Sequence, residues 1–106
     1  MVEHNTSKIG TEFKITFSHE AIDGRPISEM DFSAIVSTDR GGKPKKYEKD
    51  DCIKIDEDTY AAPVDSAEIG YGRYFIDIIL HVPDTHFPAG YRKEIKTYYS
   101  GKEILP

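Results

Sequence analysis

The sequence predicts an all-β domain in which two antiparallel sheets, of about six to eight short strands in total, pack face to face. Isoleucine, threonine, tyrosine, phenylalanine and valine supply 36 of the 106 residues, against 10 from alanine, leucine and methionine. β-branched and aromatic side chains favour a pleated, half-buried surface. Several segments alternate apolar and polar residues, and turn-forming residues separate them. Because each strand has one apolar face to bury, a sandwich follows, with a small barrel as the alternative.

The first half of the chain predicts a leader followed by four strands. Residues 1–10 end at Gly10 and are expected to form a flexible leader, so that the domain spans residues 11–106. Phe13, Ile15 and Phe17 alternate with polar residues, as is typical of a half-buried strand over residues 11–18. The other strands are expected over residues 31–38, 45–49 and 52–55, with at most a helical turn within 27–32.

The strongest strand signal lies in the second half, over residues 73–82. Its alternate positions are all apolar and are expected to line the core: Tyr74, Ile76, Ile78, Leu80 and Val82. A preceding strand over residues 59–64 contains Pro63. Because proline cannot donate a hydrogen bond to a neighbouring strand, we expect this strand to lie at the edge of a sheet.

Two turns and a last strand complete the predicted order. Residues 66–72 contain Gly70 and Gly72 and read as a turn. Residues 83–90 contain two prolines and form a longer loop, which Phe87 is expected to anchor to the core. A strand is expected over residues 91–100, with a short final pairing at 104–105.

Charge and cysteine content exclude several classes of protein. The formal net charge of −5 disfavours a nucleic-acid partner, because phosphate binding needs a basic face. The lysines between Lys43 and Lys49 are interrupted by Glu48 and are interpreted as a solvated hairpin end. With Cys52 alone, no intrachain disulfide can form. No apolar run is long enough for a signal peptide or a membrane span, so we expect a soluble chain made in the cytoplasm, without a membrane partner.

Residues that could carry chemistry form no convincing pattern. Asp56, Glu57, Asp58 and Asp65 offer oxygen ligands for calcium, and Asp84 could join them from another loop. The EF-hand spacing is absent, so we interpret them as an exposed acidic tip. His81 and His86 flank Asp84, yet a zinc site needs three or four convergent ligands. His19 and Glu20 are neighbours in the chain, and neighbouring residues of a strand point to opposite faces, so they are not expected to act together as a catalytic pair. We therefore expect no metal, no cofactor and no enzymatic activity.

Tyrosines offer one alternative function, carbohydrate binding. Four of the seven lie at predicted strand ends or outward positions: Tyr71, Tyr91, Tyr98 and Tyr99. Aromatic rings can stack on sugars, although tryptophan is missing from this chain. Packing in the core and at sheet edges explains tyrosines equally well.

The favoured function is protein interaction through one face of a sheet. Phe75 and Ile79 lie opposite the apolar stripe of residues 73–82 and would be exposed unless loops or another chain cover them. Together with Tyr98 they are expected to form a compact apolar patch, a mark of an interface with a protein partner or a second copy.

Short stretches in both halves of the chain carry a family resemblance. They are IGTEFKI at 9–15, Asp23-Gly24, IDEDTYAAPVDS at 55–66, IGYGRY at 69–74 and VPDTHFPAGYRKE at 82–94. The chain resembles small immunoglobulin-like domains encoded in prophages of gut bacteria and, more loosely, the N-terminal domain of phage baseplate upper proteins. The resemblance implies an immunoglobulin-like sandwich with a structural or adhesion role in a tail-like particle. It implies no catalytic residues.

Overall fold

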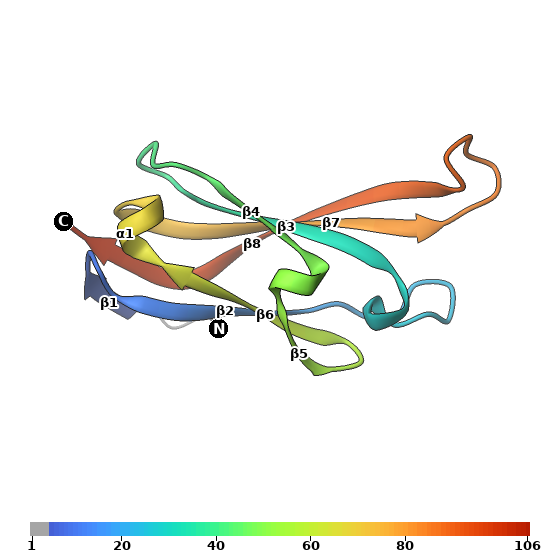
Figure 1. The fold of residues 1–106 in the computed structure, drawn as a ribbon, viewed down its shortest axis with the longest axis horizontal. Coiled ribbons are helices and arrows are strands. Elements are labelled where there is room, and N and C mark those ends of the chain that lie inside the picture. The colour runs from blue at the N-terminus through green and yellow to red at the C-terminus, as the bar shows by residue number, and fades with distance from the viewer. Residues whose placement is uncertain (1–4) are drawn as a thin grey trace.

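The computed structural model describes residues 5–106 and folds them into eight strands arranged in two sheets (Figure 1). The strands are β1 (Asn5–Lys8), β2 (Glu12–Ser18), β3 (Asp31–Thr38), β4 (Lys45–Glu48), β5 (Ile53–Asp56), β6 (Thr59–Asp65), β7 (Gly72–Pro83) and β8 (Tyr91–Leu105). One sheet has the order β1-β8-β7-β3-β4 and the other β2-β6-β5. The prediction of an all-β chain with two sheets is confirmed.

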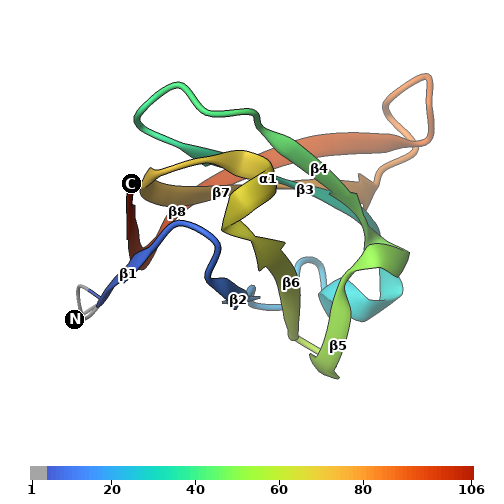
Figure 2. The same ribbon diagram turned by 60° about the vertical axis from the view of Figure 1, so that its left-hand side comes forward.

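The core lies between the two sheets, which form separate layers when the molecule is turned (Figure 2). β7 contributes the predicted stripe, and all five of its side chains are buried: Tyr74, Ile76, Ile78, Leu80 and Val82. From the opposite sheet come Ile15, Phe17, Tyr60, Ala62 and Val64, which are also buried. Phe32 of β3 meets Phe17 and Tyr60 with ring centroids 5.8 and 4.8 Å away, both edge to face. This geometry adds about 0.5–1.5 kcal/mol per aromatic pair beyond simple burial.

The chain crosses between the sheets through a four-residue helix, α1 (Ser66–Ile69), where the sequence predicted only a turn. The carboxylate of Asp65 accepts a hydrogen bond from the backbone N–H of Ala67, 3.0 Å away, and so caps the helix. Ser66 is fully buried, and its hydroxyl donates to the carbonyl of Thr11 at 2.8 Å. After the helix, the hydroxyl of Tyr74 donates to the carbonyl of Gly70, and burial raises the pKa of Tyr74 to about 12.

The prediction of a flexible leader over residues 1–10 is wrong for residues 5–8, which form a strand. Asn5–Lys8 form β1, which pairs in parallel with Lys102–Leu105 at the end of β8. The predicted final pairing at residues 104–105 belongs to the same arrangement, and Ile104 is buried. Parallel pairing satisfies backbone groups whatever the side chains, so a polar strand can form there. Residues 1–4 of the predicted leader lie outside the described residues.

The prediction that residues 59–64 form an edge strand is also wrong. β6 lies between β2 and β5. However, β5 pairs with β6 only from Thr59 to Ala61, so β6 has no β5 partner at Pro63. A proline fits a central strand at a position where one neighbouring strand has already ended.

The loop predicted after residue 82 is present, but its Phe87 does not lie where the sequence predicted. β7 and β8 are neighbours in one sheet, so the loop closes a hairpin, with the backbone N–H of Asp84 donating to Gly90 at 2.9 Å. Phe87 is 45% exposed at the tip of this hairpin and does not anchor it to the core. No helix among the described residues has the length and apolar character needed to cross a membrane.

Candidate protein interface

The surface most suited to binding is the outer face of the five-stranded sheet, which points away from β2, β5 and β6. In the antiparallel register, Phe75 lies opposite Tyr99 and Ile79 lies opposite Ile95. Residues opposite each other share a face of the sheet. Phe75 and Ile79 alternate with the buried stripe of β7, so all four side chains point outward. Ile35 on β3 pairs with Asp77 and points outward as well.

These five side chains, Ile35, Phe75, Ile79, Ile95 and Tyr99, are called the apolar patch below. The rings of Phe75 and Tyr99 are 5.2 Å apart at an angle of 39°, so they support each other across the strands. Ile95 is 61% exposed, the largest exposure among the large apolar side chains that the structure describes. An exposed isoleucine in the middle of a long strand contributes little to the core of its own domain.

Paired polar groups surround the apolar patch. At its centre, the hydroxyl of Thr97 donates to the carboxylate of Asp77 at 2.6 Å. Ion pairs lie around it, between Lys46 and Glu48 at 3.4 Å and between Arg73 and Asp39 at 2.8 Å. The ring of His81 contacts the carboxylate of Asp31 at 3.3 Å. The two ion pairs place opposite charges next to each other on the outer face.

The structure brings together two of the three predicted interface residues and separates the third. Tyr98 lies opposite Ile76 of the core stripe, so it is on the inner side of the sheet, where it remains 37% exposed. The prediction that Tyr98 joins Phe75 and Ile79 is therefore wrong. Its sequence neighbour Tyr99 takes that place, because adjacent residues of a strand point to opposite faces.

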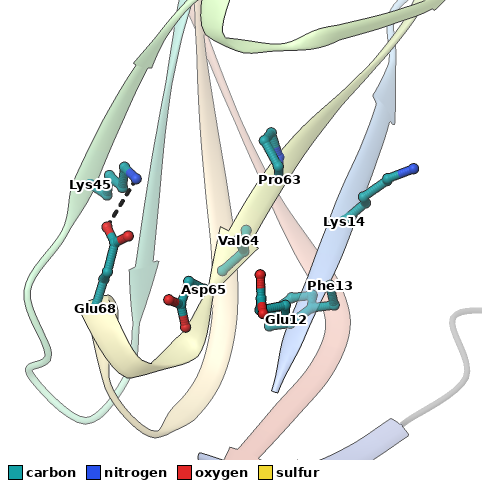
Figure 3. A pocket seen from close by; sticks show the side chains of 8 residues that line it. All are labelled: Glu12, Phe13, Lys14, Lys45, Pro63, Val64, Asp65 and Glu68. Carbon is teal, nitrogen blue, oxygen red and sulfur yellow. Dashed lines mark hydrogen bonds and ion pairs between the residues drawn. The ribbon is translucent and has the colours of Figure 1, made fainter. Parts of the chain in front are cut away.

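A pocket of about 500 Å³ lies between β2, β6 and α1 (Figure 3). Its acidic side chains come from Glu12, Asp65 and Glu68. Glu68 forms an ion pair with Lys45 at 2.9 Å on one side of the pocket, and Asp65 caps α1. Two of the three carboxylates, those of Asp65 and Glu68, therefore already have structural partners. Across residues 5–106, no group of three or more histidine, cysteine, aspartate or glutamate side chains could hold a metal ion.

The residues considered for calcium are spread over three regions. Asp56, Glu57 and Asp58 form the turn between β5 and β6, Asp65 lies at the far end of β6, and Asp84 lies in the β7–β8 loop. Glu57 accepts hydrogen bonds from Ser28 and, at 2.9 Å, from Lys54. These two contacts, first that of Ser28, hold the pKa of Glu57 below its usual value. The Glu57 carboxylate of this turn therefore already has hydrogen-bond partners within the domain.

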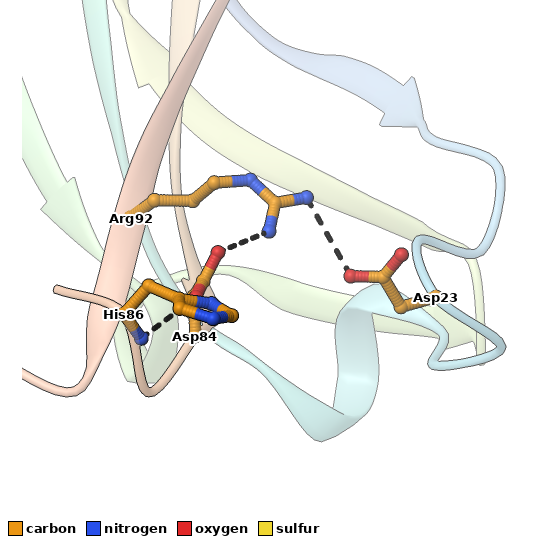
Figure 4. Close-up of polar contacts among 4 residues, drawn as sticks. All are labelled: Asp23, Asp84, His86 and Arg92. Carbon is orange, nitrogen blue, oxygen red and sulfur yellow. Dashed lines mark hydrogen bonds and ion pairs between the residues drawn. The ribbon is translucent and has the colours of Figure 1, made fainter.

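Asp84 and His86 belong to a polar cluster at the base of the hairpin tip (Figure 4). The guanidinium of Arg92 lies 3.0 Å from Asp84 and 3.5 Å from Asp23, so it joins the tip to the turn after β2. The backbone N–H of His86 donates to Asp84 at 3.0 Å and is the main cause that lowers the pKa of that carboxyl, with Arg92 also contributing. His81 instead stacks on Tyr91, with ring centroids 4.3 Å apart, and contacts Asp31. The two histidines thus contact different carboxylates.

Cys52 and His19 have ordinary structural surroundings. Burial, and secondarily the nearby Asp51, raise the pKa of the Cys52 thiol to about 11. A thiol in that state is a poor nucleophile at neutral pH. His19 contacts the carbonyl of its neighbour Glu20 at 2.7 Å.

The tyrosines considered for sugar binding do not share one surface. Tyr71 is exposed beside the start of β7, Tyr91 stacks on His81, Tyr98 faces inward, and Tyr99 packs on Phe75. A stacking platform needs rings that face the same side.

No protein-family model, no curated protein and no solved structure matches the chain. What the geometry offers is an apolar patch on a sheet, with ion pairs at its border and the Asp77 carboxylate at its centre. Such a surface can bury apolar area against another protein.

Proposed function

We propose that this chain is a non-enzymatic structural module that binds proteins through the apolar patch. In this proposal it is an immunoglobulin-like sandwich, made in the cytoplasm and built into a particle of phage-tail or baseplate type. The observation that carries the proposal is the position of Ile95, Phe75, Ile79 and Tyr99 together on the outer side of the sheet.

The strand order supports the immunoglobulin-like part of the proposal. Strands β2-β6-β5 have the arrangement of immunoglobulin strands B-E-D, and β8-β7-β3 that of G-F-C. β4 then corresponds to the additional strand C′ beside C. The hydrogen bond from the hydroxyl of Tyr74 back to the carbonyl of Gly70 lies at the start of the F-like strand. It has the form of the tyrosine corner found at the E–F connection of such domains.

The partner that best fits the apolar patch is a second copy of this chain. A whole molecule with a formal charge of −5 repels its copies in general. Two ion pairs on the outer face reduce that cost, since they place both signs side by side. Burying Ile95 completely would contribute about 1–2 kcal/mol per copy.

The particle setting is supported by the sequence resemblance. Its stretches fall on the β5–β6 hairpin, on the α1–β7 connection and on the tip of the β7–β8 hairpin. These are the turns that set the path of the chain. The resemblance thus concerns the shape of the domain, whereas the apolar patch supplies its contact surface.

The experiment measures molar mass by light scattering after size-exclusion chromatography, over a range of protein concentrations. We expect the unmodified chain to form a dimer. Ile95→Lys should weaken the association at least about tenfold, because it buries a charge in the contact. Ile53→Lys is the matched control, since Ile53 is 41% exposed and pairs with Ala61 on the outer face of the other sheet.

A monomer at all concentrations, with no co-elution when other particle proteins are added, would overturn the proposal. Co-elution with another particle protein that Ile95→Lys abolishes would keep the apolar patch as the interface and replace the second copy as its occupant. An equal effect of Ile53→Lys and Ile95→Lys would show that the patch is not the contact surface.

A further inference from the structure

The molecule is elongated, with extents of 47 × 25 × 24 Å, and its two ends are built from different elements (Figure 1). At one end, α1 lies beside β1, the β3–β4 loop and the end of β8. At the other lie the segment between β2 and β3 and the tip of the β7–β8 hairpin. The β5–β6 turn adjoins that segment, since the carbonyl of Asp58 accepts a hydrogen bond from the backbone N–H of His19 at 3.0 Å. The α1 end comprises residues 5–14, 38–45, 65–73 and 100–106, and the loop end residues 19–31, 56–58 and 83–94.

The two ends carry opposite excess charge. The α1 end has seven basic and five acidic residues: Lys8, Lys14, Arg40, Lys43, Lys45, Arg73 and Lys102, against Glu12, Asp39, Asp65, Glu68 and Glu103. The loop end has three basic and nine acidic residues: Arg25, Arg92 and Lys93, against Glu20, Asp23, Glu29, Asp31, Asp56, Glu57, Asp58, Asp84 and Glu94. The formal net charge of −5 is therefore concentrated at the loop end.

Each end also presents an exposed charge that its own ion pairs do not use. Lys43 lies on the β3–β4 loop, and its backbone N–H donates to the carbonyl of Ile69 at 2.9 Å, which holds the loop against α1. Glu20 follows β2 at the loop end. Among residues 5–106, neither side chain forms an ion pair, and both are exposed.

The shapes of the two ends are complementary as well. Residues 39–44 project as a loop beside α1 (Figure 1). At the loop end, residues 18–20 and 56–59 line a hollow of about 510 Å³. Its lining includes the exposed carboxylates of Glu20 and Asp58. One end of the molecule thus projects a loop that carries Lys43, and the other offers an acidic hollow.

We propose that copies of this chain join end to end, with the β3–β4 loop of one copy against the hollow at the loop end of the next. The net charge opposes association in general, but this alignment brings opposite excess charges together. The two surfaces of the contact differ, so it repeats from copy to copy instead of closing as a two-fold dimer. It does not involve the apolar patch and therefore goes beyond the proposed function.

The test is sedimentation velocity of the Ile95→Lys chain, whose contact through the apolar patch is weakened. It compares roughly 10 mM and 150 mM salt, at which charges act over about 30 and 8 Å. We expect the mean mass to rise with protein concentration at the lower salt and to fall to that of a monomer at the higher salt.

Two charge reversals in this chain locate the contact. Lys43→Glu and Glu20→Lys should each weaken the association at least about threefold, because each turns the attraction of an exposed pair into repulsion. An equimolar mixture of the two variants should associate again, since the reversed ends match each other. Lys96→Glu is the matched control: it makes the same charge change at an exposed position in the middle of β8 and should leave the association unchanged.

A chain that stays monomeric at low salt would overturn the proposal. So would a mixture of the two variants that associates no better than each alone, or a loss with Lys96→Glu equal to that with Lys43→Glu. Salt separates this proposal from the proposed function. The dimer of the unmodified chain should persist at the higher salt, because apolar contacts hold it, whereas the end-to-end contact is lost there.

Discussion

The two outer faces of the sandwich differ sharply, although both sheets bury similar inner faces. The five-stranded sheet turns Ile35, Phe75, Ile79, Ile95 and Tyr99 outward. The three-stranded sheet turns mainly polar residues outward, among them Glu12, Lys14, Thr16, Ser18, Thr59, Pro63 and Asp65, and its exposed large apolar residues, Ile53 and Ile55, lie on the short strand β5. A sheet of this domain can therefore fold with a mainly polar outer face. The apolar outer residues of β7 and β8 therefore call for an explanation outside the fold, and a contact with another chain provides one.

The largest expected effect separates the two sides of β7. Ile78 is 1% exposed and Ile79 is its half-buried neighbour on the outer side. Ile78→Ala should lower the free energy of unfolding by about 3 kcal/mol, because it leaves a cavity between the sheets. Ile79→Ala should cost less than about 1.5 kcal/mol, because the space it leaves opens to solvent.

Urea denaturation of the two variants at low protein concentration measures this difference. Equal losses would mean that the outer side of β7 is part of the core. The distinction between an inner stripe and an outer patch would then fail.

A second effect concerns the rim of the outer face and depends on pH. The pKa of Asp39 is lowered from its ordinary value of 3.8, first by the backbone N–H of Arg73 and then by the Arg73 guanidinium. A carboxyl whose pKa is lower in the folded state stabilises the fold above the unfolded value, and this contribution is lost as the pH falls through the folded value. The unmodified chain should be more stable than Asp39→Asn near pH 7. The difference in their free energies of unfolding should become smaller below pH 3.8.

Thermal unfolding from pH 7 down to acid measures this gap. Arg73→Met is the matched variant, and it should retain part of the pH dependence, since the backbone N–H remains. A gap between the unmodified chain and Asp39→Asn that is constant with pH would show that the carboxyl has no stabilising partner at the rim.

The inner side of the fold was largely predictable from the sequence. Over β7, every inward position from Tyr74 to Val82 is apolar, so the period of two identifies both the strand and its buried face. The same held for Ile15 and Phe17 on β2. β1 could not be found in this way, because Asn-Thr-Ser-Lys has no apolar side and joins β8 through its backbone.

β8 explains why the patch was only partly predicted. Its more apolar side, with Ile95 and Tyr99, faces outward, and its inward side carries Glu94 and Lys96. The rule that the more apolar side faces the core therefore fails for this strand. Only the register with β7 shows that Tyr99, and not Tyr98, joins Phe75. Register depends on how the chain returns through the loop over residues 84–90, which alternation does not encode.

The smallest expected effect tests the centre of the patch. Asp77 is the charged residue between Phe75 and Ile79, and its carboxylate accepts a hydrogen bond from Thr97. In a dimer formed by this face, two such carboxylates come close together, and like charges in a contact oppose association.

Asp77→Asn keeps an oxygen that can accept from Thr97, so the free energy of unfolding should change by less than about 0.5 kcal/mol. The dimer should become tighter by about twofold to fivefold at low salt, and this gain should shrink as salt screens the repulsion. Sedimentation equilibrium at two salt concentrations measures both quantities. Weaker association of Asp77→Asn would mean that Asp77 meets a positive group of the partner, so that the two copies do not meet centre to centre.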